Sequence, residues 1–81
     1  MKIIYFANMK QIIGINEESF ELKEKIKVRE LIDILKKRNE NYSLAFNKSN
    51  IQCAVNCKYV DRNFVIKNTD EIAFFPPVTG G

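Results

Sequence analysis

One stretch in the middle of this 81-residue chain has the periodicity of a helix that buries a single face. Its apolar residues fall at i, i+3, i+4 and i+7, namely Val28, Leu31, Ile32 and Leu35. The charged residues between them are expected mostly on the opposite side, in water. A chain of this length can bury one core if its packing is economical. The sequence therefore predicts one small domain in which this helix covers a core.

Segments with the composition of β-strands lie on both sides of the helix. The predicted strands are residues 2–9, 19–23, 51–56, 58–60 and 71–75. In the second of these, Phe20 and Leu22 alternate with polar residues, which predicts a hairpin with the first strand. This order predicts an α+β fold of the β-grasp type, a mixed sheet packed on one main helix.

The ends of the helix and the turns have unequal signals. Lys27 lies near the predicted N-cap, where Ser, Thr or Asp is preferred, whereas basic residues and Asn39 suit the end of the helix. There is no glycine between Gly14 and Gly80, although several turns are needed. Asparagine tolerates the left-handed backbone conformation best after glycine. We therefore expect turns at Asn47, Asn50, Asn56, Asn63 and Asn68.

The side chains available for catalysis are few. The chain has no histidine, which removes the commonest general base near neutral pH and the commonest metal ligand. If both cysteines lay on one strand, Cys53 and Cys57 would be about 13 Å apart, which is too far for a disulfide. A zinc site would need further Cys or His ligands, which the sequence lacks. We expect Cys53 to be buried, Cys57 to be an exposed, oxidisable thiol in a turn, and no metal or cofactor to be bound.

Charge and hydropathy argue against two further classes of protein. The net charge is +3, but the lysines between positions 23 and 37 are interleaved with acidic residues, as on a solvated helix face. The aromatic residues are not interleaved with basic ones, so a nucleic-acid-binding β domain is disfavoured. No apolar run approaches the roughly 20 residues of a membrane span, and the first residues have the pattern of a strand. A cytoplasmic location is expected.

The last six residues have an unusual composition for a chain end. Pro76 and Pro77 favour an extended path, and residues 76–81 can reach about 18 Å at roughly 3.1 Å per residue. Gly80 and Gly81 lack a Cβ, so a narrow channel can close on their backbone. A frayed end, the alternative, is usually polar. We therefore predict a domain over residues 1–75 and a tail over residues 76–81 whose reacting group is the carboxylate of Gly81.

A carboxylate is a poor electrophile, and a partner enzyme would have to activate it, for example as an acyl-adenylate. Sulfur could then displace the adenylate and leave a thiocarboxylate, which can donate its sulfur. These steps need no acid, base or metal from the small protein itself. The absence of histidine is consistent with this chemistry.

The residues now described resemble a known family. Asp-Glu-Ile-Ala-Phe-Phe-Pro-Pro-Val-Thr-Gly-Gly at residues 70–81, with support from residues 5–10 and 54–56, is similar to the sulfur-carrier small subunits of molybdopterin synthase. The resemblance covers the whole chain and implies a ubiquitin-like β-grasp fold. It implies that a ubiquitin-activating-type adenylyltransferase uses ATP to adenylate Gly81, and that a sulfur-donating enzyme supplies the thiocarboxylate sulfur.

The resemblance also implies a partner. The tail, including Pro76, Pro77, Val78, Thr79 and Gly80, would insert into a large synthase subunit, where the sulfur builds the dithiolene from cyclic pyranopterin monophosphate. The synthase would be a heterotetramer of two large and two small subunits, and the other catalytic residues would belong to the large subunit. Docking would use Phe6, Tyr59 and Phe75, although each of them could instead be a core residue.

Two related functions share the first chemical step. A thiazole-pathway sulfur carrier has the same Gly-Gly end, but such carriers are usually shorter and lack the Phe-Phe-Pro-Pro-Val-Thr approach. A ubiquitin-like protein modifier would join Gly81 to a lysine of a target through an isopeptide bond. Lysine-linked adducts would favour the modifier, and a free small protein that gains sulfur would favour the carrier.

Overall fold

A computed structural model describes residues 1–47 and 50–77 of the chain. The strands are β1 (Lys2–Tyr5), β2 (Glu17–Ser19), β3 (Ile26–Lys27), β4 (Gln52–Val55), β5 (Lys58–Val60), β6 (Val65–Ile66) and β7 (Glu71–Phe75). The helices are α1 (Asn8–Ile13), α2 (Val28–Lys36) and α3 (Glu40–Asn47). The predicted strands at residues 51–56, 58–60 and 71–75 are confirmed to within one residue at each end, and the predicted helical stripe lies in α2.

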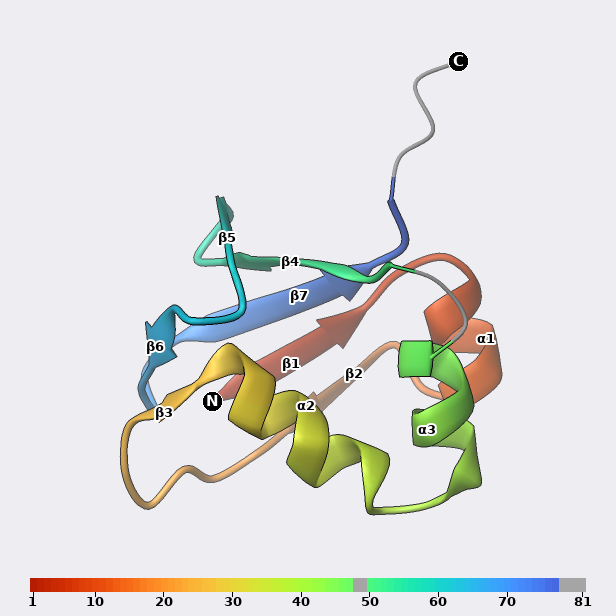
Figure 1. Cartoon of the computed structure of the whole chain (residues 1–81), viewed down its shortest axis with the longest axis horizontal. Coiled ribbons are helices and arrows are strands. Elements are labelled where there is room, and N and C mark those ends of the chain that lie inside the picture. Colours follow the sequence, from red (N-terminus) through yellow and green to blue (C-terminus); the bar gives the residue numbers. More distant parts are fainter. Residues whose placement is uncertain (48–49, 78–81) are drawn as a thin grey trace.

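Five strands form a mixed sheet in the order β2-β1-β7-β4-β5, and β3 pairs with β6 in a separate two-stranded ribbon. The central pair, β1 and β7, is parallel, and the other pairs are antiparallel. The helices lie on one side of the sheet and leave its other face uncovered (Figure 1). This is the predicted β-grasp arrangement of an α+β domain.

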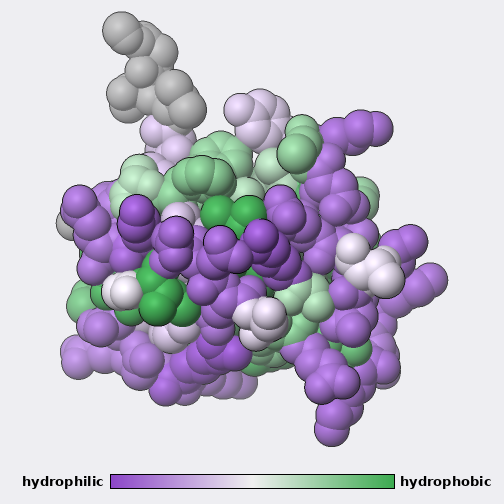
Figure 2. All heavy atoms as spheres, turned by 180° about the vertical axis from the view of Figure 1, so that it is seen from behind, coloured by the Kyte–Doolittle hydropathy of each residue, from purple (hydrophilic) through white to green (hydrophobic). Residues whose placement is uncertain are grey.

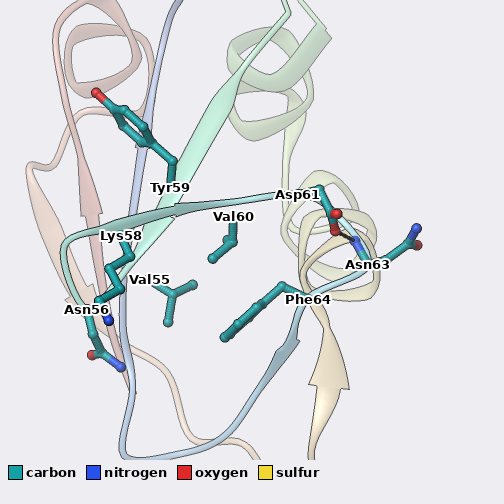
Figure 3. A pocket seen from close by; sticks show the side chains of 8 residues that line it. All are labelled: Val55, Asn56, Lys58, Tyr59, Val60, Asp61, Asn63 and Phe64. Atoms are coloured by element: carbon teal, nitrogen blue, oxygen red, sulfur yellow. Dashed lines mark hydrogen bonds between the residues drawn. The ribbon is translucent and has the colours of Figure 1, made fainter.

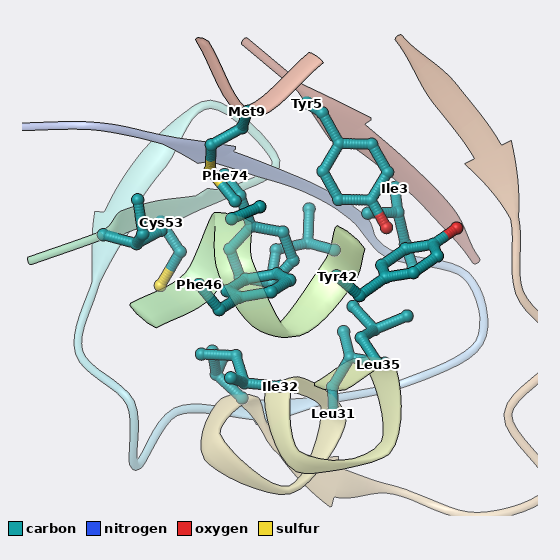
Figure 4. Close-up of a cluster of buried hydrophobic side chains, with 14 of the residues drawn as sticks. Ile3, Tyr5, Met9, Leu31, Ile32, Leu35, Tyr42, Phe46, Cys53 and Phe74 are labelled. Atoms are coloured by element: carbon teal, nitrogen blue, oxygen red, sulfur yellow. The ribbon is translucent and has the colours of Figure 1, made fainter. Parts of the chain in front are cut away.

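The core lies between the sheet and the helices (Figure 4). All four residues of the predicted helical stripe are buried, which confirms the face that α2 turns to the sheet. Phe74 on β7 is fully buried, its ring centroid 6.3 Å from that of Tyr5 and 5.0 Å from that of Phe46. The aromatic centre of the core is therefore supplied by β1, β7 and α3.

Two helices that were not predicted, α1 and α3, pack on the core in addition to the predicted main helix α2. The first strand ends at Tyr5 and not at residue 9, since the chain turns at Ala7 (φ 54°) and enters α1. Gly14 ends α1 in the left-handed conformation (φ 97°), and its N–H donates to the carbonyl of Lys10 (2.9 Å). Asn39 begins α3 and does not close α2, because its Oδ1 accepts from two backbone N–H groups of α3.

The second strand lies earlier than expected, at Glu17–Ser19 and not at residues 19–23. Its pairing with the first strand is confirmed. Phe20 and Leu22 follow the strand and pack on the core from irregular backbone. Pairing with the first strand continues as far as Phe20, whose N–H donates to the carbonyl of Met1 (2.8 Å). The N–H of Leu22 donates instead to Asn68 Oδ1 (2.8 Å).

The start of α2 is capped by groups that are not at the N-cap position. The Glu30 carboxylate accepts from the N–H of Lys27 (2.9 Å), which is one half of a capping box. The next two N–H groups donate to the carbonyls of Phe64 and Arg62, both at 3.0 Å. These distant partners explain why the sequence around Lys27 has a weak start signal.

A two-residue turn at Asn56 and Cys57 joins β4 to β5, and both residues have positive φ, 51° and 70°. The left-handed conformation predicted for asparagine is thus confirmed at Asn56. Turns are also present at Asn63 and Asn68, as predicted, but there the asparagine keeps negative φ. The Asn56 side chain donates to Asp70 Oδ1 (2.9 Å), so the turn is tied to the start of β7.

Glu18 on β2 anchors a group of polar side chains at the edge of the core. Its carboxylate accepts from the hydroxyls of Tyr5 (2.8 Å) and Tyr42 (2.7 Å) and pairs with Arg38. The Arg38 guanidinium also lies over the ring of Phe20, 5.1 Å from its centroid. This network joins β1, β2, α3 and the end of α2.

We expect Cys57→Gly to stabilise the domain. A left-handed Cys carries a steric cost that glycine avoids, so the free energy of unfolding should rise by about 0.5–1 kcal/mol in urea titrations. Cys57→Ala is the matched control, since it removes the thiol but keeps the Cβ, and it should give no gain. A loss of stability in Cys57→Gly would contradict this account of the turn.

The pH dependence of stability should depend on Glu18. Burial alone would raise the pKa of Glu18, but hydrogen bonds from Arg38, Tyr42 and Tyr5 outweigh it and hold the pKa below its ordinary value. Burial and the bond to Glu18 raise the pKa of Tyr5. A lowered carboxyl pKa gives stability that is lost as the pH falls below about 4, and a raised tyrosine pKa gives stability that is lost above about pH 10.

Unfolding of wild type and Glu18→Gln between pH 2 and pH 11 tests this expectation. Glu18→Gln should cost about 1–3 kcal/mol at neutral pH and flatten the pH profile at both ends. Glu17→Gln is the matched control, because Glu17 pairs with Lys2 (3.1 Å) at the exposed surface and should leave the profile nearly unchanged. Equal profiles for wild type and Glu18→Gln would contradict the assignment.

Candidate functional site

The uncovered face of the five-stranded sheet carries a row of apolar side chains. The strand registers place Ile4 beside Ala73, Ala73 beside Ala54, and Ala54 beside Tyr59. Small side chains at the centre of the row and larger ones at its ends make a shallow depression. Apolar side chains gather in the upper part of the molecule in Figure 2. We call the lining of this depression the apolar face: Ile4, Phe6, Ala54, Cys57, Tyr59, Glu71, Ala73 and Phe75.

The three residues predicted for docking meet on this face. Phe6 is 49% exposed and Tyr59 80% exposed, while Phe75 is half-buried. The ring centroids of Tyr59 and Phe75 lie 5.6 Å apart. The alternative placement in the core therefore does not describe these residues, and the buried aromatic of this segment is the neighbouring Phe74.

The tail leaves the domain at the apolar face. β7 ends at Phe75, Pro76 is half-buried and Pro77 is exposed. A small hollow is lined by Gln52, Tyr59, Phe75 and Pro77, so the first tail residues lie beside the aromatic pair. The predicted tail residues Val78, Thr79, Gly80 and Gly81 lie outside the described residues.

Sequence reasoning did not assign Glu71, Cys57 and the small residues of the apolar face to the site. Strand alternation is the signal that locates them, because Glu71, Ala73 and Phe75 point to one side of β7 and Ile72 and Phe74 to the other. Cys57 is exposed in its turn, as predicted. Cys53 is buried, also as predicted, and burial raises the pKa of its thiol. Its nucleophilicity is correspondingly low.

A larger hollow lies on the helix side of β5 (Figure 3). Val55, Val60 and Phe64 line it, and the ring of Tyr59 points away from it. At one end the N–H of Asn63 donates to Asp61 Oδ1 (2.8 Å). The Asp61 carboxylate thus stabilises a local turn. Among the described residues that line this hollow, no nucleophile is paired with a general base.

The described residues offer binding surface more than catalytic chemistry. Within residues 1–47 and 50–77, no three or more His, Cys, Asp or Glu side chains are grouped so that they could hold a metal ion. In the same residues, none of the helices has the length and apolar character needed to cross a membrane. What the site presents is an aromatic, largely apolar face beside the exit of a proline-led tail.

Comparison with known proteins agrees with this description. The ThiS family model matches residues 3–81. A Haemophilus influenzae protein named molybdopterin synthase sulfur carrier subunit is 32% identical over 82 residues, covering 100% of this chain and 99% of the relative. The solved structure of a Pyrococcus furiosus protein assigned as molybdopterin converting factor subunit 1 is 35% identical, with a TM-score of 0.78 and 95% of each chain covered. A Helicobacter pylori chain solved in a complex of subunits 1 and 2 of molybdopterin-converting factor is 23% identical, with a TM-score of 0.69 and 99% of this chain and 96% of that chain covered.

Truncating an aromatic side chain should destabilise the domain strongly on the inner face of the sheet and hardly at all on the outer face. Phe74→Ala should lower the free energy of unfolding by about 3–5 kcal/mol, because Phe74 is fully buried. Tyr59→Ala should change it by less than about 0.5 kcal/mol, because that ring is exposed. Urea denaturation measures both. A large loss in Tyr59→Ala would mean that the apolar face serves the fold and is not kept free for a partner.

Proposed function

Because this chain belongs to the ThiS family, we propose that it is the sulfur-carrier subunit of a molybdopterin synthase. Similarity over the full length to relatives with that name supports the proposal. The observation that carries it is the continuity between the apolar face and the tail, since Pro77 lies beside Tyr59 and Phe75. A partner that covers this face receives the tail at the same time.

The chemistry is assigned to the carboxylate of Gly81. An adenylyltransferase joins this carboxylate to the AMP of ATP and releases pyrophosphate. A sulfur atom delivered as hydrosulfide then attacks the acyl carbon, and AMP leaves with the electrons of the broken C–O bond. The product is a thiocarboxylate with a C–S bond at Gly81. The small protein supplies the acyl group, and the activating and sulfur-donating enzymes supply the catalysis.

Phe6, Tyr59 and Phe75 are proposed to dock on the large subunit of the synthase. Exposed aromatic side chains lose little conformational entropy on binding and bury much area, which makes them effective anchors. Pro76 and Pro77 restrict the free tail, so less entropy is lost when residues 78–81 enter the partner. The complex of subunits 1 and 2 solved for the Helicobacter pylori protein supports a partner of this kind.

The remaining assignments follow from this role. The large subunit would hold the other catalytic residues and cyclic pyranopterin monophosphate, which receives the sulfur. Two large and two small subunits would form the active heterotetramer. Because activation uses ATP, the protein is proposed to act in the cytoplasm.

Intact mass spectrometry tests the carrier role. The protein incubated with its adenylyltransferase, ATP and hydrosulfide should gain about 16 Da, the replacement of one oxygen by sulfur, and fragmentation should map the gain to Gly81. A variant that lacks Gly81 is the matched control and should remain unmodified. The modified protein, mixed with the large subunit and cyclic pyranopterin monophosphate, should return to its original mass as the pterin gains sulfur.

Each alternative function predicts a different result in the same experiment. A protein modifier would form lysine-linked adducts on other proteins when a lysate is added. A thiazole-pathway carrier would gain the same 16 Da but would not pass its sulfur to the pterin with the large subunit. An unchanged mass under activating conditions would overturn the carrier proposal.

A further inference from the structure

Glu71 is the one carboxylate among the described residues that line the apolar face. It is the first residue of β7, and strand alternation turns its side chain to the same side as Ala73 and Phe75. The Glu71 side chain is half-buried. Any partner that covers Ala73 and Phe75 therefore also covers this carboxylate, at least in part.

The backbone of Glu71 is held on both sides by Asn56. The N–H of Glu71 donates to Asn56 Oδ1 (3.0 Å), and the N–H of Asn56 donates to the carbonyl of Glu71 (2.8 Å). Asn56 is itself held by Asp70, which also accepts from the N–H of Lys67 (2.9 Å). The carboxylate of Glu71 is thus presented from a rigid position, although its own oxygens make none of these bonds.

Among the described residues, no ammonium or guanidinium group forms a direct ion pair with this carboxylate. Over residues 1–47 and 50–77, the Glu71 side chain has no hydrogen bond or ion pair, and the ion pairs present are Lys2–Glu17 and Arg38–Glu18. Lys2 lies opposite Glu71 in the parallel register, and its ammonium pairs with Glu17 at 3.1 Å. Glu17 is the main cause of the raised pKa of Lys2, and the charge of Glu71 adds only the smallest contribution. The Glu71 oxygens therefore feel a nearby cation that is shared with Glu17, but they have no bonded partner among the described residues.

Covering an unpaired carboxylate with an apolar surface is costly, because the charge loses its water without gaining a partner. We propose that the large subunit presents an arginine or lysine side chain to Glu71, within an otherwise apolar contact. This inference rests on the proposed function, since it assumes that the large subunit covers the apolar face. The charge pair would fix the orientation of docking, whereas the aromatics supply buried area.

Calorimetric titration of the full chain with the large subunit tests the proposal. Glu71→Gln should bind about tenfold more weakly and Glu71→Lys about a hundredfold more weakly than wild type. Glu24→Lys is the matched control, because it makes the same change in net charge at an exposed position away from the apolar face. Its affinity should stay within about twofold of wild type.

The sign of the Glu71→Gln effect decides the question. If no cation faces Glu71 in the complex, removing the charge lowers the desolvation cost, and Glu71→Gln binds as tightly as wild type or more tightly. That result overturns the inference, as does an equal loss in Glu71→Lys and Glu24→Lys. Thermal melting of each variant shows that it is folded, which is expected because the side chain takes no part in the bonds to Asn56.

The titration, read together with the mass measurement of sulfur gain, separates this inference from the proposed function. Wild type that gains sulfur at Gly81 and binds the large subunit, together with Glu71→Gln of unchanged affinity, refutes only the charge pair. Wild type that neither binds the large subunit nor gains sulfur refutes the proposed function and the charge pair with it.

Discussion

The parallel pairing of β1 with β7 is the contact on which the rest of the molecule depends. It joins Lys2–Tyr5 to residues 71–74, close to the two ends of the described chain. On the inner side it brings Tyr5 and Phe74 into the aromatic centre of the core, and on the outer side it brings Ile4 beside Ala73. Because successive side chains of a strand point to opposite faces, one register determines both surfaces. The core and the candidate docking face are two sides of a single pairing.

The same alternation explains why the polar groups are distributed as they are. Glu18 satisfies two tyrosine hydroxyls and Arg38 at the edge of the core, where an unpaired polar group would be costly. Asp70 and Asn56 satisfy each other at the start of β7. Glu71, one residue further along, points to the outer face and has no such partner among the described residues. Glu71 thus differs from the bonded carboxylates of Glu18 and Asp70 in having its oxygens available to another molecule.

The parts of the fold and the site that could be predicted from the sequence are those whose signal lies in neighbouring residues. The stripe of α2 and the short, β-prone segments of β4, β5 and β7 are signals contained in neighbouring residues, and these elements were predicted correctly. In α1 and α3 the stripes are short: Met9, Ile12 and Ile13 before Gly14, and Tyr42, Ala45 and Phe46. A stripe of three residues is easily taken for a strand or a loop. The ribbon of β3 and β6 depends on contacts between distant residues, which no local pattern encodes. The aromatic residues proposed for docking were predicted from the family resemblance. The position of Glu71 on the apolar face follows only from the strand register of the structure.

The position of β7 in the sheet has a consequence for how the protein is made. β7 lies between β1 and β4, so the sheet has a gap at its centre until residues 71–75 have been synthesised. The pairing of β1 with β7 joins residues at opposite ends of the described chain, and such contacts form slowly because closing a long loop costs conformational entropy. A nascent chain that stops before β7 lacks both the core residue Phe74 and Phe75 of the apolar face. Translation must therefore pass through β7 before the domain can fold, and an unfinished chain has neither a completed core nor a completed apolar face.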